Sequence, residues 1–358
     1  MAYTTIDDPS AYFQTNLHSG DGGTGQTLTF DGNSDLQLDF HWGKCRSESG
    51  RDWQVIDTVR GITKGLTTTT SAAEYTNSTY VTAIGSNGYS IGQNNDNNKA
   101  GETYVSYNWK GNSSGTSVSA SGGVDGYNAC THYANQDAGF SIVKYTGRNS
   151  VLNNGQDTRV THGLGVIPKM IIIKSTDTVQ NWVVFHHYNW NGCHFNLNTN
   201  SAMNCNLYVG NNNNTTSSYF NVGNNDLTNK NSANFISYVF AEKKGYSKFG
   251  HVVGNGSATN GTFCYTGFKP AWILVKNKAS GNWQLLDNKR NLFNVAVNSL
   301  SPDVSDAEYT TETDIDFLSN GFKFYENYNL NKTGDTYIFA AFAENPFVTS
   351  TGVPATAR

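Results

Sequence analysis

Short hydrophobic runs recur along the chain, each bounded by glycine, asparagine or aspartate. The runs are rich in β-branched and aromatic residues, as in "NWVVFHH" and "GDTYIFAAFAE", and this composition between turn-forming residues is typical of β-strands. Asparagine and glycine dominate the strings between the runs, where they accept positive φ angles and form tight turns. Helical periodicity is weak and occurs only near "TSAAEY" and "VSDAEY". The pattern therefore predicts an all-β protein.

The same pattern of hydrophobic and polar positions occurs three times. The segment 319–342 aligns with 86–109 without a gap, and 220–240 keeps the same spacing. A second segment, earlier in each copy, also repeats, and its alignment matches Trp42 with Trp272. A repeat of about 100 residues indicates a repeated domain and not one turn of a solenoid. The positions that the copies share are Trp53, Trp182 and Trp283, Asp57 with Arg60, Asp287 with Arg290, and Tyr104, Phe235 and Tyr337.

The repeat divides the chain into three tandem homologous units, which we expect to be antiparallel β-sandwiches or jelly-roll-like folds with short connectors. The second and third units follow each other almost directly, so we expect them to pack together. A continuous core across 111–140 or 244 would contradict this division. The predicted segments are an N-terminal arm at 1–16, a first unit at 17–111, a Gly/Ser-rich connector at 112–139, a second unit at 140–244, a third unit at 245–347 and a C-terminal tail at 348–358.

Charged side chains make up 15% of the 358 residues, against roughly 25% in an average soluble domain. Asparagine is common, with 46 residues, and 36 glycines accompany it. The aromatic content of 13% indicates a folded chain, so we expect a neutral surface that forms hydrogen bonds. The net charge is −4 and basic residues do not cluster, which argues against nucleic acid as a partner. We expect no membrane span and no secretory signal, because no apolar run approaches ~18 residues and the start is acidic.

The cysteines are five in number and include no C-x-x-C pair. They also do not recur at matching positions of the repeat, as the ligands of a copied zinc or disulfide framework would. We therefore expect free thiols that are mostly buried. The five are Cys45, Cys130, Cys193, Cys205 and Cys264.

The middle copy differs from the others in a segment rich in histidine and aromatic residues, 185–196. Adjacent strand residues point to opposite faces, so His186 and His187 cannot readily share a metal ion. Aromatic rings stack on the apolar face of a sugar, and amides bind its hydroxyl groups. The segment is therefore a candidate glycan-binding site, with ordinary packing as the alternative. Its candidate residues are His187, Tyr188, Asn189, Trp190, Asn191 and His194.

Two repeated acid–base pairs, Asp57 with Arg60 and Asp287 with Arg290, are candidates for either ligand binding or structure. Each pair follows a strand at the same distance from a tryptophan. Arginine and carboxylate form bidentate ion pairs, and these pairs are copied along with the scaffold. We therefore expect them to fix the loop after the strand.

Asparagine-rich turns superficially resemble calcium loops, but they lack the terminal glutamate of that motif, so plain Asx turns are the prediction. Phosphate-binding loops and the H-E-x-x-H motif of zinc proteases are absent from the sequence. We expect a protein that is not an enzyme and that binds no cofactor or metal. A depolymerase stays an alternative, although the repeats share no acid pair except Glu74 and Glu308, in a segment expected at the surface. The turns are 94–102, 224–234 and 327–335.

The chain resembles a domain repeated in virion structural proteins of marine tailed bacteriophages, of the type found in phages of cyanobacteria and other ocean bacteria. The resemblance covers nearly the whole chain and is carried by the opening "MAYTTIDDPSAYFQTNLHSGDG" and by "HGLGVIPKMIIIK", "FAEKKGYSKFGHVVGNGS", "YTGFKPAWILVKN" and "YIFAAFAENPF". The middle copy departs from the pattern at "FHHYNWNGCHFN". This departure leaves the equivalence of the three units in function open.

The resemblance implies a non-enzymatic virion component, assembled in the host cytoplasm. A tail fibre or tail appendage involved in host attachment is the preferred interpretation. The alternatives are a capsid decoration or head-fibre protein, a carbohydrate-binding receptor module, and a polysaccharide depolymerase. The expected partners are other virion proteins, bound through the N-terminal arm, a host cell-surface glycan, and further copies of the chain, with a trimer as the usual arrangement of a fibre.

Overall fold

Antiparallel strands make up nearly all of the regular structure, so the all-β prediction is confirmed. Within the described residues, helix is confined to α1 (Asp226–Asn229) and two 3₁₀ turns, η1 (Pro9–Ala11) and η3 (His187–Asn189). The computed structural model describes residues 2–122, 126–148, 157–189, 192–205, 210, 215–311, 315–326 and 328–354.

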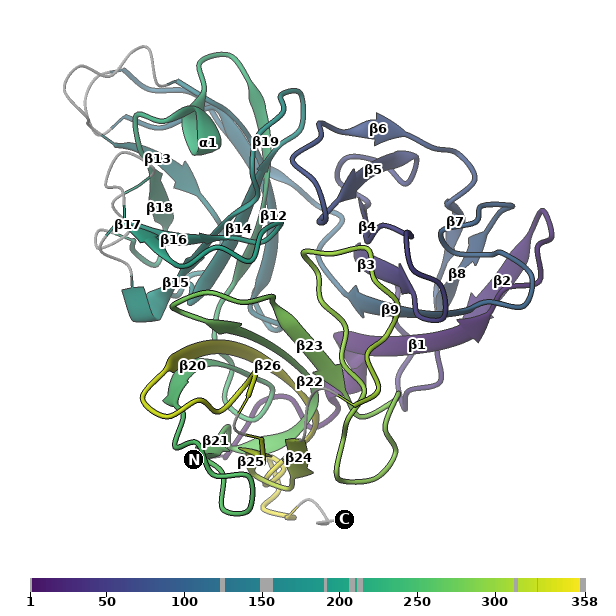
Figure 1. Ribbon diagram of the computed structural model, residues 1–358. Helices are drawn as coiled ribbons and strands as arrows, with labels where there is room; N and C mark the ends of the chain where they lie inside the picture. Colours follow the sequence, from purple (N-terminus) through teal and green to yellow (C-terminus); the bar gives the residue numbers. More distant parts are fainter. Residues whose placement is uncertain are drawn as a thin grey trace.

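Three lobes surround a common centre, and each is built on one large sheet (Figure 1). The first lobe has β1 (Phe13–Ser19), β9 (Thr103–Trp109), β3 (Phe40–Cys45), β4 (Gln54–Asp57), β5 (Lys64–Thr67) and β6 (Tyr75–Thr76), in that spatial order. The second has β10 (Thr116–Val118), β11 (Cys130–Asn135), β12 (Phe140–Thr146), β19 (Asn234–Phe240), β14 (Met170–Ser175), β15 (Val183–His186), β16 (Cys193–Asn196) and β17 (Asn204–Cys205). The third has β20 (Ser247–Val253), β26 (Thr336–Pro346), β22 (Phe268–Asn277) and β23 (Gln284–Asp287).

The three large sheets share a four-strand order. The first strand of the motif pairs with the last, the last with a central strand, and the central strand with the strand that follows each repeated tryptophan. These four-strand sets are β1-β9-β3-β4, β12-β19-β14-β15 and β20-β26-β22-β23. The shared order supports the interpretation of three related units. Their common origin stays a prediction.

A small sheet covers the outer face of each large sheet, which makes each lobe a sandwich. Each sandwich encloses its own hydrophobic cluster, for example around Phe220 in the second lobe and Phe322 in the third. The small sheets are β2 (Gln26–Thr29), β8 (Gly88–Ile91) and β7 (Val81–Gly85); β13 (Thr158–Thr161) and β18 (Tyr219–Val222); and β21 (Phe263–Tyr265), β25 (Gly321–Phe324) and β24 (Ile315–Leu318).

The largest core lies between the lobes and belongs to all three. Trp109, Phe240 and Phe342, the last residues of the shared motif in each sheet, meet at ring-centroid distances of 5.4–6.2 Å. The core therefore continues across the boundaries near 111–140 and 244, and the prediction of separate modules with interrupted cores is wrong in this respect. The reason is physical: both faces of each large sheet are apolar, so a single sandwich leaves one face uncovered. The second and third lobes do pack together, as predicted, but the first lobe packs against both.

Two of the predicted segment boundaries are also wrong. The segment 112–139 is not simply a connector, because β10 and β11 extend the second sheet beside β12. The N-terminal arm is not a free extension, because β1 already begins at Phe13 and the residues before it pack on the third lobe. Thr4 and Ile6 are buried, and the hydroxyl of Thr4 donates to the carbonyl of Lys244 at 2.8 Å.

The strand ladders correct one detail of the repeat. Trp272 stands opposite Asp287 across β22 and β23, whereas Phe40 stands opposite Asp57 across β3 and β4. Trp272 is therefore the counterpart of Phe40 and not of Trp42. The pairing of Trp42 with Trp272 came from matching two tryptophans in hairpins whose loops differ in length by two residues.

Candidate functional site

Three buried tryptophans join the lobes into a closed ring. Each indole N–H donates a hydrogen bond to a backbone carbonyl of another lobe. The three acceptor residues occupy corresponding positions, because each lies in the segment that pairs with the strand following the tryptophan of its own lobe. The first lobe binds the third, the second binds the first, and the third binds the second. The donor–acceptor pairs are Trp53 with Ser301 (2.9 Å), Trp182 with Thr67 (2.8 Å) and Trp283 with Asn196 (2.9 Å).

A lysine is buried near each of these contacts, at one shared position of the central strand. The ammonium group of Lys44 donates to the carbonyl of Ser305 at 3.3 Å, and that of Lys174 donates to the carbonyl of Ser71 at 3.1 Å, in each case on a neighbouring lobe. Burial lowers the pKa of each lysine from 10.5 to about 8, because the charged form loses hydration. The three are Lys44, Lys174 and Lys276.

The predicted ion pairs are present, and they lie inside the interfaces between lobes. Arg60 Nε donates to Asp57 Oδ2 at 2.5 Å, and Arg60 Nη1 donates to Glu74 at 3.1 Å. The hydroxyl of Tyr238, from the second lobe, donates to the same oxygen of Asp57 at 2.7 Å. The third lobe repeats this network against the first with Asp287, Arg290, Glu308 and Tyr107.

These networks are shielded from solvent. The side chains of Asp57 and Asp287 are fully buried, and Glu308, which was expected at the surface, has a side chain only 9% exposed. Burial raises the pKa of Tyr107 and of Tyr238 well above the usual value, so each phenol stays protonated and donates. Such residues hold lobes together, and the two aspartates are closed off from any ligand, although Arg60 and Glu74 reach the edge of a hollow between the first and second lobes.

The interface between the second and third lobes has different residues at the same positions. His186 takes the place of Asp57, and Ala340 takes that of Tyr238.

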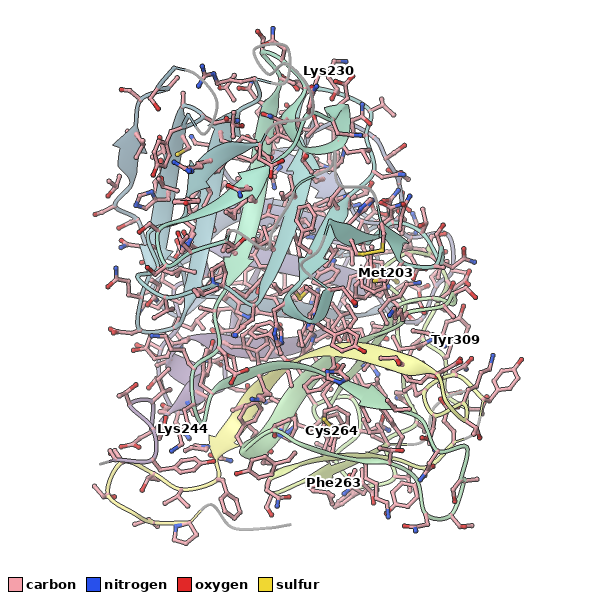
Figure 2. All side chains as sticks on the ribbon, turned by 90° about the vertical axis from the view of Figure 1, so that its left-hand side faces the viewer. Met203, Lys230, Lys244, Phe263, Cys264 and Tyr309 are labelled. Atoms are coloured by element: carbon pink, nitrogen blue, oxygen red, sulfur yellow. A yellow bond between two sulfur atoms is a disulfide. The ribbon has the colours of Figure 1, made fainter. Side chains whose placement is uncertain are left out.

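The His186 Nε2 donates to the carbonyl of Phe339 at 3.2 Å, while its Nδ1 accepts from the amide of Tyr188. Burial and the neighbouring His187 lower the pKa of His186 to about 3, so it is neutral. At this interface, therefore, a neutral histidine replaces the carboxylate and a small alanine side chain replaces the phenol. Met203, at the position of Glu74, lies where these two lobes meet (Figure 2).

The candidate glycan residues do not form one exposed face. His187 Nε2 hydrogen-bonds the carbonyl of Phe249 at 3.0 Å, and the ring of Tyr188 stacks on His251 at a centroid distance of 3.9 Å. One face of Tyr188 is therefore covered by the protein itself. His194 is buried against Phe185, while Asn189 is half-buried at the end of η3. Trp190 and Asn191 lie outside the described residues.

The cysteine prediction is wrong for two residues. Cys193 and Cys205 face each other across β16 and β17 and form a disulfide. Cys45, Cys130 and Cys264 are free and buried, as predicted. The sequence carries no sign of this disulfide, because the bond requires only that the two short strands β16 and β17 lie side by side.

The asparagine-rich turns contain a buried asparagine whose amide binds backbone groups. Asn98 Nδ2 donates to the carbonyls of Gly23 and Gly92, and Asn98 Oδ1 accepts from the amide of Asp21. A Cβ on Gly20 would lie 2.2 Å from the carbonyl oxygen of Lys99, so glycine is required where the turn meets the first strand. This geometry agrees with Asx turns. The corresponding asparagines of the other lobes are Asn229 and Asn331.

One group of potential metal ligands occurs among the described residues, Cys45 with Glu48 and Glu102. Glu48 is already paired with Arg51 at 2.8 Å and with Lys99 at 2.6 Å. Salt bridges within the protein therefore account for this cluster. In the part of the chain that the structure describes, helices are too short to cross a bilayer.

A groove of about 710 Å³ opens where the third lobe meets the first. Thr15 of β1 lies in its floor, Ala271 and Glu344 of the third lobe form one wall, and the loop that follows β23 forms the rim. Leu292 and Phe293 of this loop are 66% and 82% exposed. Sequence reasoning missed this site, because its residues come from distant segments.

The groove arises from two departures from the other interfaces. Asp287 and Leu300 are separated by thirteen positions, whereas the corresponding Asp57 and Leu66 are separated by nine, so the third lobe has a longer loop. The floor residue, Thr15, stands where the other first strands carry larger side chains, and these are Ile142 and Phe249.

A family model described as "Domain of unknown function (DUF7483)" matches residues 8–346, which is nearly the whole chain. The chain therefore belongs to this family, and the matched region contains all three lobes. Searches of curated proteins and of solved structures found no match.

Proposed function

We propose that this protein is a non-enzymatic structural component of a tailed-bacteriophage virion, most simply a tail fibre or tail appendage that takes part in host attachment. The observation that carries this proposal is the closed ring of three lobes, in which the repeated charged residues serve as buried joints. A rigid scaffold built by repetition suits a protein selected for shape. The sequence resemblance to virion proteins of marine phages supports the proposed location.

The burial of the repeated carboxylates supports a role without catalysis. Asp57 and Asp287 each accept hydrogen bonds from an arginine and a tyrosine, and both are inaccessible to a substrate. A general acid or base must come within hydrogen-bonding distance of the reacting group. The acidic residues that the repeat preserves therefore act on the protein's own lobes.

The surface chemistry fits a particle exposed to sea water. At that ionic strength the Debye length is roughly 3–5 Å, so surface ion pairs contribute little. Asparagine, serine, threonine and glycine hydrogen-bond with water and with carbohydrate at any salt concentration. The chain has 46 asparagines and only 15% charged residues, as this proposal requires.

The end of the molecule that carries both termini is the proposed attachment end (Figure 1). The Tyr3 hydroxyl donates to the carbonyl of Gly267 at 2.7 Å, and the Asp7 carboxylate accepts from the amide of Ser350 at 2.6 Å. The N-terminal segment thus presents a folded surface to its neighbours in the particle. The ring closes within one chain, so a homotrimer of this protein would add contacts outside the shared core.

Purified particles test the proposal. Mass spectrometry should find the protein in virions, and cryo-electron microscopy should place a three-lobed density on the tail, with the end near Tyr3 facing the particle. Density on the capsid would favour a head decoration. Absence of the protein from purified virions, or release of reducing sugar from host polysaccharide by the purified protein, would contradict the proposal.

A further inference from the structure

We propose that the groove between the first and third lobes binds a neutral saccharide. This inference deepens the proposed role in host attachment and rests on it for its biological purpose, but the binding itself is a property of the isolated protein. It moves the sugar-binding function away from the segment around Tyr188, whose ring is covered by His251.

The first argument is that the groove breaks the symmetry of the scaffold. At the two other interfaces the loop that follows the tryptophan strand rests on the first strand of the next lobe, where Lys144 Nζ contacts the carbonyl of Val59 and Tyr188 stacks on His251. At the third interface the loop is longer and a cavity remains beneath it. A hollow of about 610 Å³ also lies beside Val59 and Lys144 between the first and second lobes, so the third interface differs in its longer loop and in its larger groove of about 710 Å³.

The second argument is the small side chain in the floor. Thr15 is 5% exposed, and it stands where the other two first strands carry Ile142 and Phe249. Its hydroxyl oxygen exposes less than 1 Å², so a ligand in the groove rests on the side chain and does not replace a hydrogen-bond partner. The smaller residue leaves space beneath the loop that the larger residues would fill.

The third argument is the charge of the lining. Lys269 Nζ lies 2.5 Å from Glu344, and Lys289 Nζ lies 2.7 Å from Asp31, so these charges are compensated within the protein. The carboxylate of Asp8 is held by the amide and hydroxyl of Ser10 and by a further serine. Asp8 has amide and hydroxyl partners and no paired cation among the described residues, so the one uncompensated charge of the lining is a carboxylate, which disfavours an anionic ligand.

The fourth argument is the pairing of an exposed ring with amides. Phe293 is 82% exposed at the rim, and Asn33, Asn291 and Asn345 line the groove. An aromatic face packs against the C–H face of a pyranose, while amides match its hydroxyl groups. The volume of about 710 Å³ lies in the range of small-ligand sites, roughly 300–1,000 Å³. A wholly apolar ligand would leave these amides buried without partners.

Ligand-observed NMR on the purified full chain tests this assignment. The neutral probes are the methyl glycosides of glucose, galactose, mannose and N-acetylglucosamine, and glucuronic acid is the anionic comparison. We expect at least one neutral probe to bind. Phe293→Ala should weaken that binding by about threefold to tenfold, as expected for loss of one aromatic contact. Tyr328→Ala, which removes a ring that is 68% exposed and lies outside the groove, should leave it unchanged.

A second variant tests the floor of the groove. Thr15→Ile copies the residue that β12 carries at the corresponding position, Ile142, and should reduce binding while the thermal unfolding midpoint confirms a folded chain. Binding of glucuronic acid alone, binding of no neutral probe, or equal binding by wild type and Phe293→Ala would overturn the assignment. The virion location is tested separately on particles, so a protein found in virions that binds none of the probes would remove only the saccharide site.

Discussion

The hydroxyl of Tyr238 donates a 2.7 Å hydrogen bond to the carboxylate of Asp57, which lies 181 residues earlier in the chain and in a different lobe. The same carboxylate also binds Arg60, so one buried oxygen links a loop of the first lobe to β19 of the second. The bond between Tyr107 and Asp287 repeats this link at the next interface. Contacts of this kind convert a row of sandwiches into a ring.

Loss of the carboxylate charge at such a joint should destabilise the whole chain. Asp57→Asn removes the nearer of the two carboxylates that pair with the buried Arg60 and leaves only Glu74, and removing one partner of a buried ion pair costs about 3–5 kcal/mol. Urea unfolding followed by tryptophan fluorescence measures the loss. The matched control is Asp31→Asn, whose side chain is 68% exposed and pairs with Lys289; its effect should stay within about 1 kcal/mol. Equal effects of the two substitutions on the free energy of unfolding would show that the buried ion pair stabilises the chain no more than the exposed one.

The buried lysines predict a specific pH dependence of stability. Their folded-state pKa of about 8 lies below the unfolded-state value of 10.5, so between these values the unfolded chain binds more protons. The lysines therefore make the free energy of unfolding rise with pH above about 8. Burial raises the pKa of Cys264 from 9 to about 12, which works in the opposite direction above pH 9.

The lysine effect is best measured between pH 8 and 9, before the thiol and the tyrosines contribute. Lys44→Met, Lys174→Met and Lys276→Met each remove one titrating group, and each variant should show a smaller increase in unfolding free energy with pH than the wild type. Urea titrations at several pH values provide this comparison. Identical pH profiles in all four proteins would mean that the ammonium groups keep their hydration in the folded state.

The disulfide gives a chemical prediction. Unfolding the protein in denaturant without reductant should expose three alkylatable thiols, at Cys45, Cys130 and Cys264, and reduction should raise the number to five. Mass spectrometry after iodoacetamide treatment counts the modified residues. Modification of all five cysteines without reductant would contradict the bond between Cys193 and Cys205.

Local features of the fold could be predicted from the sequence, because strands and turns depend on neighbouring residues. The ion pair of Asp57 with Arg60 is one example, since the two residues are only three positions apart. The positions of the repeated tryptophans are another. The ring closure was hidden because its partners lie in other lobes. Tyr107 and Tyr238 share one strand position, but Ala340 breaks the pattern in the third copy.

The buried lysines and the groove were hidden for a different reason. A lysine between apolar neighbours normally has its charged end in solvent, and only the packing of another lobe encloses Lys44. The groove depends on the absence of a large side chain at Thr15 and on the extra length of the loop that carries Phe293. Neither departure is visible until the strand ladders establish which residues correspond.

The central claim is that the three lobes form one cooperative structure around a shared core. Hydrogen–deuterium exchange of wild type and Trp283→Ala, read by mass spectrometry, tests it most directly. The indole of Trp283 lies in the shared core and binds Asn196 of the second lobe. We predict faster exchange in β9 and β19 as well as in β26. Faster exchange confined to the third lobe, with β9 and β19 unchanged, would contradict the claim.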